Sequence, residues 1–129
     1  SMEYIKKLNI KTPSGDQITG NLSGGNQQKI VIAKWLLNDP DIIILDEPTR
    51  GIDVGAKYEI YELMNGLCEE GKCVVMVTSD MEELLGMSDR IVVFGEKCLA
   101  GELTKEEFSQ ERILDMASTS DRENETMGA

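Results

Sequence analysis

Two adjacent acidic residues, Asp46 and Glu47, are the strongest candidates for chemistry in this sequence. They follow the apolar run IIIL at residues 42–45, which predicts a buried β-strand. In α/β proteins, ligands bind beyond the carboxyl ends of parallel strands. One carboxylate there suits Mg²⁺, and a second can orient and deprotonate a water that attacks a terminal phosphate. Taken alone, the pattern also fits a strand that ends in a polar turn.

A second candidate is the segment LSGGNQQK at residues 22–29. Ser23 is a suitable helix N-cap, and the two glycines after it leave the backbone N–H groups accessible. The N-terminus of a helix attracts anions because its first N–H groups are unpaired and its dipole end is positive. The segment therefore predicts a phosphate contact at the start of a helix.

Residues 66–73, GLCEEGKC, imitate a phosphate-binding loop but do not fit one. A true P-loop follows a strand and opens a helix, whereas this segment closes a predicted helix and opens a strand. Helix carbonyls would face the loop, and Glu69 and Glu70 add negative charge. We therefore interpret Gly71 as a helix terminator.

The elements that position these residues alternate between helices and short strands. We predict strands at 42–45, 73–79 and 90–94, the first two buried, with a return strand within 95–102. Helices are predicted after Ser23 as far as the Asn-Asp-Pro stop, at 55–70, at 80–89, and from the capping box of Thr104 and Glu107 to about Ala117. Residues 1–21 form an N-terminal segment and loop, and 118–129 a disordered tail. The order predicts an α/β fold with a parallel sheet.

Composition excludes several classes of function. The chain has 129 residues and a net charge of −11, with no basic cluster, which argues against a nucleic-acid surface. No apolar run is long enough to span a bilayer, and no signal peptide is evident. The sequence has three cysteines and no histidine, so it lacks a zinc-ligand pattern and suggests free thiols in a reducing compartment.

The order of the motifs resembles that of the ATPase subunit of ABC transporters. LSGGNQQ, a helix, IIILDEPTRGID, VVMVTSD and DRIVVF correspond to the signature motif, the Walker B strand, the D-loop and the switch strand of that family. The exact residues in and around these motifs, such as DEPTRGIDVGAK, are similar to those of the second nucleotide-binding domain of monosaccharide importers of the ribose, galactose and xylose type. The resemblance implies a three-layer, partial P-loop NTPase domain over residues 22–117, with a mainly parallel sheet flanked by helices.

The resemblance assigns ATP and Mg²⁺ as cofactors of the complete protein. Ser23, Gly24 and Gly25 would contact the γ-phosphate of an ATP held by the opposite nucleotide-binding domain. Gln27 and Gln28 would either help across that interface or form a solvated helix face.

The catalytic roles would fall on the acidic residues that follow the signature helix. Asp46 would hold Mg²⁺, Glu47 would be the general base, and Asp53 would lie in the D-loop that couples the two sites. The family commonly has a histidine at the switch position, where this sequence has Ser79. Serine lacks the charge and reach of imidazole, so we predict weak hydrolysis at the site that this Walker B segment completes.

The Walker A loop and the Q-loop, which precede the signature motif in this family, have no counterpart here. The sequence looks like the C-terminal part of one nucleotide-binding domain, and we expect the isolated chain neither to bind nor to hydrolyse ATP. In the family, the Walker A strand lies between the strands at 73–78 and 90–95. Without it, we expect the sheet either to close directly or to expose an edge and dimerise.

The function implied by the resemblance is part of an ATPase that drives sugar import. Its partners would be a companion nucleotide-binding domain, the sugar permease and, indirectly, a sugar-binding protein, but no nucleic acid. The location would be cytoplasmic, on the inner face of the plasma membrane. Two alternatives remain at this stage: an ATPase half of the chromosome-maintenance and DNA-repair type, and a non-catalytic interaction module.

Overall fold

The computed structural model describes residues 22–127, and their side chains as far as residue 118. The chain divides into two compact units, before and after the bond between Val77 and Thr78. The predicted segment 1–21 lies outside the described residues.

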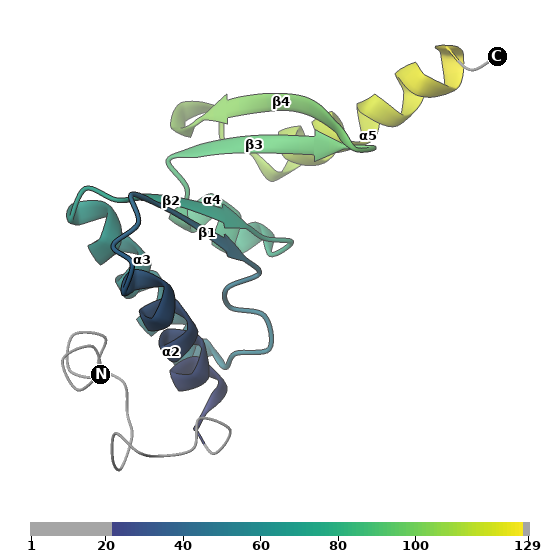
Figure 1. Cartoon of the computed structure of the whole chain (residues 1–129). Helices are drawn as coiled ribbons and strands as arrows, with labels where there is room; N and C mark the ends of the chain where they lie inside the picture. The colour runs from purple at the N-terminus through teal and green to yellow at the C-terminus, as the bar shows by residue number, and fades with distance from the viewer. Residues whose placement is uncertain (1–21, 128–129) are drawn as a thin grey trace. The chain divides into compact units, whose positions relative to one another are not determined.

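The first unit contains two helices and a pair of parallel strands (Figure 1). Its elements are α2 (Gly24–Leu36), β1 (Ile42–Asp46), α3 (Val54–Glu69) and β2 (Cys73–Val77). Strands β1 and β2 pair in parallel, from Ile42 opposite Cys73 to Asp46 opposite Val77. The connection through α3 makes this a βαβ unit, as the alternation of elements predicts.

Only one face of the parallel pair is covered within this unit. Ile43 and Leu45 are buried, whereas Ile42 and Ile44 are 62% and 69% exposed, and Val75 on β2 is also exposed. The prediction that both strands are buried is therefore wrong for these residues. The described helices account for this, since α3 packs against β2 and α2 packs against α3.

The end of α3 explains why residues 66–73 are not a phosphate loop. Gly71 has a φ of +88°. Its N–H donates to the Cys68 carbonyl, and that of Lys72 donates to the Leu67 carbonyl, both at 3.0 Å. This is a Schellman C-cap. The Lys72 side chain turns away to Asp39 Oδ1 at 2.6 Å and the Pro40 carbonyl at 2.9 Å. The hydrogen bond to Asp39 raises the pKa of Lys72.

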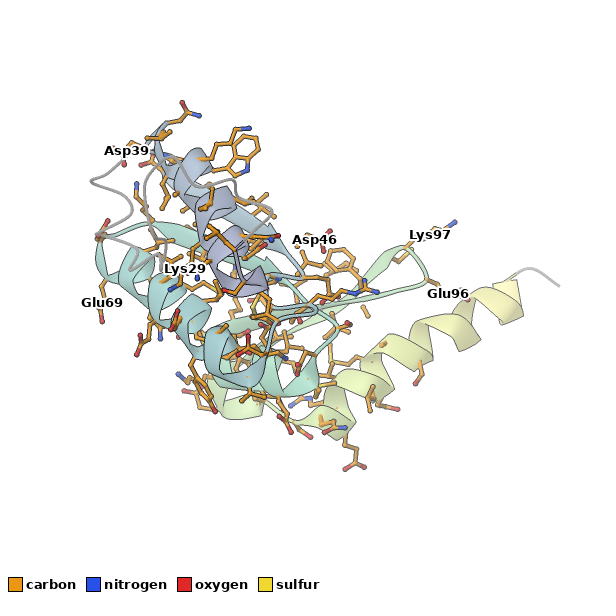
Figure 2. The ribbon with its side chains drawn as sticks, turned by 90° about the horizontal axis from the view of Figure 1, so that it is seen from below. Lys29, Asp39, Asp46, Glu69, Glu96 and Lys97 are labelled. Atoms are coloured by element: carbon orange, nitrogen blue, oxygen red, sulfur yellow. The ribbon has the colours of Figure 1, made fainter. Side chains whose placement is uncertain are left out.

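The second unit is an antiparallel hairpin with helices. It contains α4 (Met81–Met87), β3 (Arg90–Gly95), β4 (Cys98–Thr104), the 3₁₀ turn η2 (Lys105–Glu107) and α5 (Gln110–Met127). Glu96 and Lys97, at the tip of the hairpin in Figure 2, form a two-residue loop with φ values of 44° and 68°. Positive φ at both positions is typical of the type I′ turn that matches strand twist. The core of this unit comprises Ile91, Val93, Leu103 and Ile113.

The last helix differs from its prediction at both ends. The capping box exists, because the Glu107 carboxylate accepts from the Thr104 N–H at 3.0 Å, but it opens only η2. The α-helix begins at Gln110 instead, and the Ser109 carbonyl accepts from Ile113 N–H. It continues to Met127, beyond the expected end near Ala117. No glycine or proline interrupts residues 110–127.

The strands form two separate sheets in the described part of the chain. One sheet is the parallel pair β1–β2 and the other is the antiparallel pair β3–β4. Closure of the sheet and dimerisation both stay predictions. The strands predicted at 42–45 and 90–94 are confirmed, as is the return strand, which extends to Thr104. The strand predicted at 73–79 forms but ends at Val77, so Thr78 and Ser79 lie outside it.

Candidate functional site

The start of α2 has the geometry of a capped helix N-terminus. Ser23 is the N-cap, with φ −59° and ψ 154°, and its hydroxyl accepts from Asn26 N–H at 3.4 Å and from Asn26 Nδ2 at 3.0 Å. The Ser23 carbonyl accepts the first helical hydrogen bond, from Gln27 N–H at 2.9 Å. The sequence therefore places Ser23 correctly, and the exposed cap lies at the positive end of a 13-residue helix.

The two glycines after Ser23 have different surroundings. Gly24 is exposed, and a Cβ built on it would meet nothing within 4 Å. Gly25 is buried, and a Cβ there would lie 2.6 Å from the Cβ of Ala56 on α3. Gly24 is thus open to an approaching group, whereas Gly25 allows α2 to lie close to α3. This distinction cannot be read from the sequence.

The two glutamines after the glycines are both half-buried. The Gln27 amide nitrogen donates to the Leu22 carbonyl at 2.9 Å, which fastens the loop before the helix to its second turn. Gln27 therefore helps to hold the loop, a role that neither of the two predictions for it included. Gln28 lies on the same turn, and its predicted contact stays a prediction.

Asp46 and Glu47 lie where β1 ends and the chain turns away. Asp46 is the last residue of β1, exposed, and opposite Val77 in the register (Figure 2). Glu47 continues the ladder, since its N–H donates to the Val77 carbonyl at 2.8 Å, but its φ of +47° is left-handed. A left-handed backbone costs a non-glycine residue about 1–2 kcal/mol. Such strain is concentrated at functional sites, where the surrounding structure holds it in place.

The turn after Glu47 supplies that support. Pro48 and Thr49 are both buried, and the Glu47 carbonyl accepts from Arg50 N–H at 3.1 Å. The Thr49 carbonyl accepts from Ile52 N–H, also at 3.1 Å. The half-buried Glu47 side chain therefore leaves the strand in a direction fixed by its own peptide and by the turn.

Asp53 is the N-cap of α3 as well as the predicted D-loop residue. Its φ and ψ are −65° and 156°, and its carboxylate accepts from Ala56 N–H at 3.2 Å. The close approach of Gly25 to Ala56 brings the start of α2 beside the start of α3. The structure thus unites the predicted signature residues with the predicted D-loop residue at one end of a helix pair.

Ser79 belongs to the second unit, where its neighbours fix the backbone on both sides. It is exposed. The Thr78 hydroxyl donates to Glu83 Oε2 at 2.5 Å and accepts from Asp80 N–H at 3.0 Å. The Asp80 carboxylate in turn caps α4 by accepting from Glu82 and Glu83 N–H. The segment that carries Ser79 is therefore an ordered turn closed by side chains.

The described carboxylates can contribute to a metal site but do not complete one. Between residues 22 and 127, no group of three or more histidine, cysteine or acidic side chains is placed to hold an ion. Mg²⁺ commonly takes one or two carboxylates and fills its remaining positions with phosphate oxygens and water. The exposed Asp46 fits that shared mode, in which the nucleotide supplies the other ligands.

Sequence reasoning missed the buried charged residues. Lys29 is only 2% exposed, and its ammonium contacts Glu59 Oε2 on α3 at 2.5 Å. Positions 25, 29, 32 and 36 are all buried and form one stripe of α2. A lysine on the apolar side of a helix is the signal that could have revealed this residue. Glu83, 3% exposed on α4, was missed in the same way.

Comparison with known proteins links these features to one family. A sequence profile described as "ABC transporter" matches residues 2–50. A ribose import ATP-binding protein from Clostridium tetani is 60% identical over 115 residues, which is 89% of this chain and 23% of that protein. A xylose import ATP-binding protein from Thermoanaerobacter pseudethanolicus is 61% identical over 112 residues, or 87% and 22% of the two chains.

Solved structures support the same fold. The dimeric structure of an ATP-binding cassette in a post-hydrolysis state with ADP and Pi matches with a TM-score of 0.70 and 31% identity, over 83% of this chain and 46% of that one. A second cassette, in its ADP conformation, matches with a TM-score of 0.77 over 88% of this chain and 46% of that one. Its identity is 22%, so it supports the fold alone.

The α/β fold and the order of the motifs define part of a P-loop NTPase domain of the ABC class. The matches to ribose and xylose import ATP-binding proteins show that the chain is similar to part of the ATP-binding subunit of monosaccharide ABC importers, which is the resemblance predicted from the sequence. The chain spans about a quarter of the length of the curated relatives, 22–23% for the ribose and xylose import proteins. Within the described residues, no helix is both long and apolar enough to cross a bilayer.

Proposed function

We propose that this chain forms part of the ATPase subunit of a monosaccharide importer and contributes half of a composite ATP site. The observation that carries the proposal is the start of α2, where Ser23 caps the helix and Gly24 leaves its N-terminus open. Such a helix start can contact a phosphate that another domain holds. The names of the relatives, which are ribose and xylose import proteins, support the sugar class.

Two partners follow from this proposal. A companion nucleotide-binding domain would supply the nucleotide that the α2 start contacts, and the dimeric cassette that matches this fold supports such an arrangement. ATP hydrolysis would drive transport through a sugar permease. The subunit would therefore lie on the cytoplasmic face of a membrane, in contact with that permease. A sugar-binding protein would join the assembly through the permease.

The remaining residues would act at the site that this chain's own strand completes. Asp46 would hold Mg²⁺, which would supply positive charge to offset that of the phosphates, and Glu47 would orient and deprotonate the attacking water. The left-handed backbone of Glu47 and its hydrogen bond to Val77 support a fixed direction for that carboxylate. Ser79 would stand at the switch position and donate a hydrogen bond at most, so this site would hydrolyse ATP slowly.

The test uses the complete importer ATPase that contains this chain. Glu47→Gln should lower turnover less than the same change at the catalytic glutamate of the companion domain, because Ser79 already weakens the site completed by Glu47. Ser79→His should raise turnover, and Ser79→Ala serves as its control. Loss of most turnover in Glu47→Gln, with no gain in Ser79→His, would refute the proposal that the site completed by Glu47 hydrolyses ATP slowly because of Ser79.

The isolated chain provides a second, independent measurement. Titration of Mg·ATP into it by calorimetry should show no binding tighter than about 1 mM, equivalent to about −4 kcal/mol. The reason is that a phosphate cradle and its lysine, which supply most of the nucleotide contacts in P-loop enzymes, are not among the motifs of this sequence. A sub-millimolar constant would contradict the composite-site proposal.

A further inference from the structure

A charged pair lies in the contact between α2 and α3. The Lys29 side chain is 2% exposed and the Glu59 side chain is 32% exposed, and Nζ lies 2.5 Å from Oε2. Figure 2 shows Lys29 among the packed side chains of the helix pair. Lysine is almost never fully buried unless it is paired, because removing its charge from water is costly. Glu59 supplies a counter-charge to the buried Lys29.

A second contact lies one helical turn earlier on both helices. Gly25 faces Ala56 so closely that a Cβ at position 25 would be 2.6 Å from the Ala56 Cβ. Gly25 and Lys29 are four residues apart on α2, and Ala56 and Glu59 are three apart on α3, so each pair shares one face of its helix. The two contacts therefore run in the same direction along both helices, and α2 and α3 are parallel at this point. Two separate contacts of this kind fix both the sliding and the rotation of α2 against α3.

The consequence concerns the loops at the start of the two helices. Ser23 caps α2, and Asp53 caps α3, and both caps lie at the end where Gly25 meets Ala56. Apolar packing is non-directional and tolerates small shifts, whereas a hydrogen-bonded ion pair has a preferred length and direction. Apolar side chains keep the two helices in contact without fixing how far one lies along the other. An ion pair in this contact can therefore set their register.

We propose that Lys29 and Glu59 are positioning residues for the composite ATP site. They lock the α2 start to the α3 start, so that the Ser23–Gly24 end of one helix and the Asp53 cap of the other move as one body. The inference rests on the proposed function, because it is the phosphate contact at the α2 start that the lock would orient.

The experiment measures ATP turnover of the complete importer ATPase that contains this chain. The key variant is the double change Lys29→Met with Glu59→Met, because two long apolar side chains fill a similar volume and keep the helices packed. Its unfolding midpoint should stay near that of the wild type, while turnover falls about tenfold to a hundredfold, as expected for a misplaced catalytic contact. Lys34→Met is the matched control, since Lys34 is an exposed lysine on the same helix.

Coupling to Ser23 distinguishes positioning from a merely structural role. If Lys29 acts through the α2 start, Ser23→Ala should add little to the loss already caused by Lys29→Met. The swapped pair, Lys29→Glu with Glu59→Lys, should restore part of the turnover. Full turnover in the double-methionine variant, or losses that multiply independently for Lys29→Met and Ser23→Ala, would overturn the inference.

The two proposals fail in different ways. If Ser23→Ala retains full turnover, the phosphate contact at the α2 start is refuted. If Ser23→Ala is impaired but the double-methionine variant is not, only the positioning role is refuted. Hydrogen exchange of the α2 N-terminal amides in the same variants gives a readout without nucleotide. We expect these amides to exchange faster than in the wild type in Lys29→Met and at the wild-type rate in Lys34→Met. The same exchange rate in Lys29→Met as in the wild type would count against the lock.

Discussion

Replacing Gly25 with alanine tests the close contact between α2 and α3. The new Cβ would lie 2.6 Å from the Ala56 Cβ, and 3.7 Å from the Ala56 Cα. Carbon atoms pack best at about 3.5–4.0 Å, so the helices would have to separate by about 1 Å. Overpacking of this size costs typically about 1–3 kcal/mol. We therefore expect Gly25→Ala to destabilise the first unit, in spite of the better helix propensity of alanine.

Gly24 provides a matched control on the same helix. A Cβ at Gly24 would meet nothing within 4 Å, so alanine there gains at most about 1 kcal/mol from helix propensity. Because the gain from helix propensity applies to both variants, their free energies of unfolding should differ by the overpacking cost, about 1–3 kcal/mol. Trp35, the single tryptophan of the chain, lies on α2 and reports its unfolding by fluorescence in a urea titration.

A compensating change on α3 tests whether overpacking causes the loss of stability. Adding Ala56→Gly to Gly25→Ala moves the methyl group from one helix to the other, so most of the overpacking should disappear. If Gly25→Ala is as stable as Gly24→Ala, or if Ala56→Gly gives no recovery, then this contact does not set the separation of α2 and α3.

Two further predictions concern the second unit. Asp80→Ala removes the carboxylate that accepts from Glu82 and Glu83 N–H at 3.0 and 3.1 Å, and should lower its stability by about 1 kcal/mol in thermal unfolding, whereas Asp80→Asn should keep most of it. Equal losses in both variants would argue against the cap. The hydrogen bond from the Thr104 N–H lowers the pKa of Glu107 below its ordinary 4.5, so the stabilisation is present above that pH and is lost as the pH falls through the lowered value. Glu107→Gln should therefore flatten the acid side of the stability curve, and an unchanged curve would contradict this.

Local chemistry made several elements predictable. Ser23 caps its helix because its hydroxyl can reach an N–H three residues on, and Gly71 ends α3 because only glycine takes a φ of +88° without strain. The apolar runs at 42–45 and 90–94 become strands as expected. Each of these features depends on neighbours within a few residues, so each can be predicted from the sequence.

Other features depend on residues distant in the sequence that pack against a helix or strand. Ile42 and Ile44 carry the pattern of a doubly buried strand and yet are exposed in this unit, since burial depends on which helices cover the sheet. The capping box of Thr104 and Glu107 formed as expected but opened only a 3₁₀ turn. A cap specifies how a helix starts and leaves open how far it continues.

The sequence by itself determined the family, the order of the motifs and the residue types that could bind phosphate or Mg²⁺, because these follow from short spacings along the chain. Only the tertiary structure decided that Gly24 is open while Gly25 is packed, and that Lys29 is buried against Glu59. The reason is physical: two adjacent glycines are equivalent until a second helix approaches one of them. A lysine at the same spacing as apolar neighbours joins the core only when a carboxylate thirty residues away meets it there.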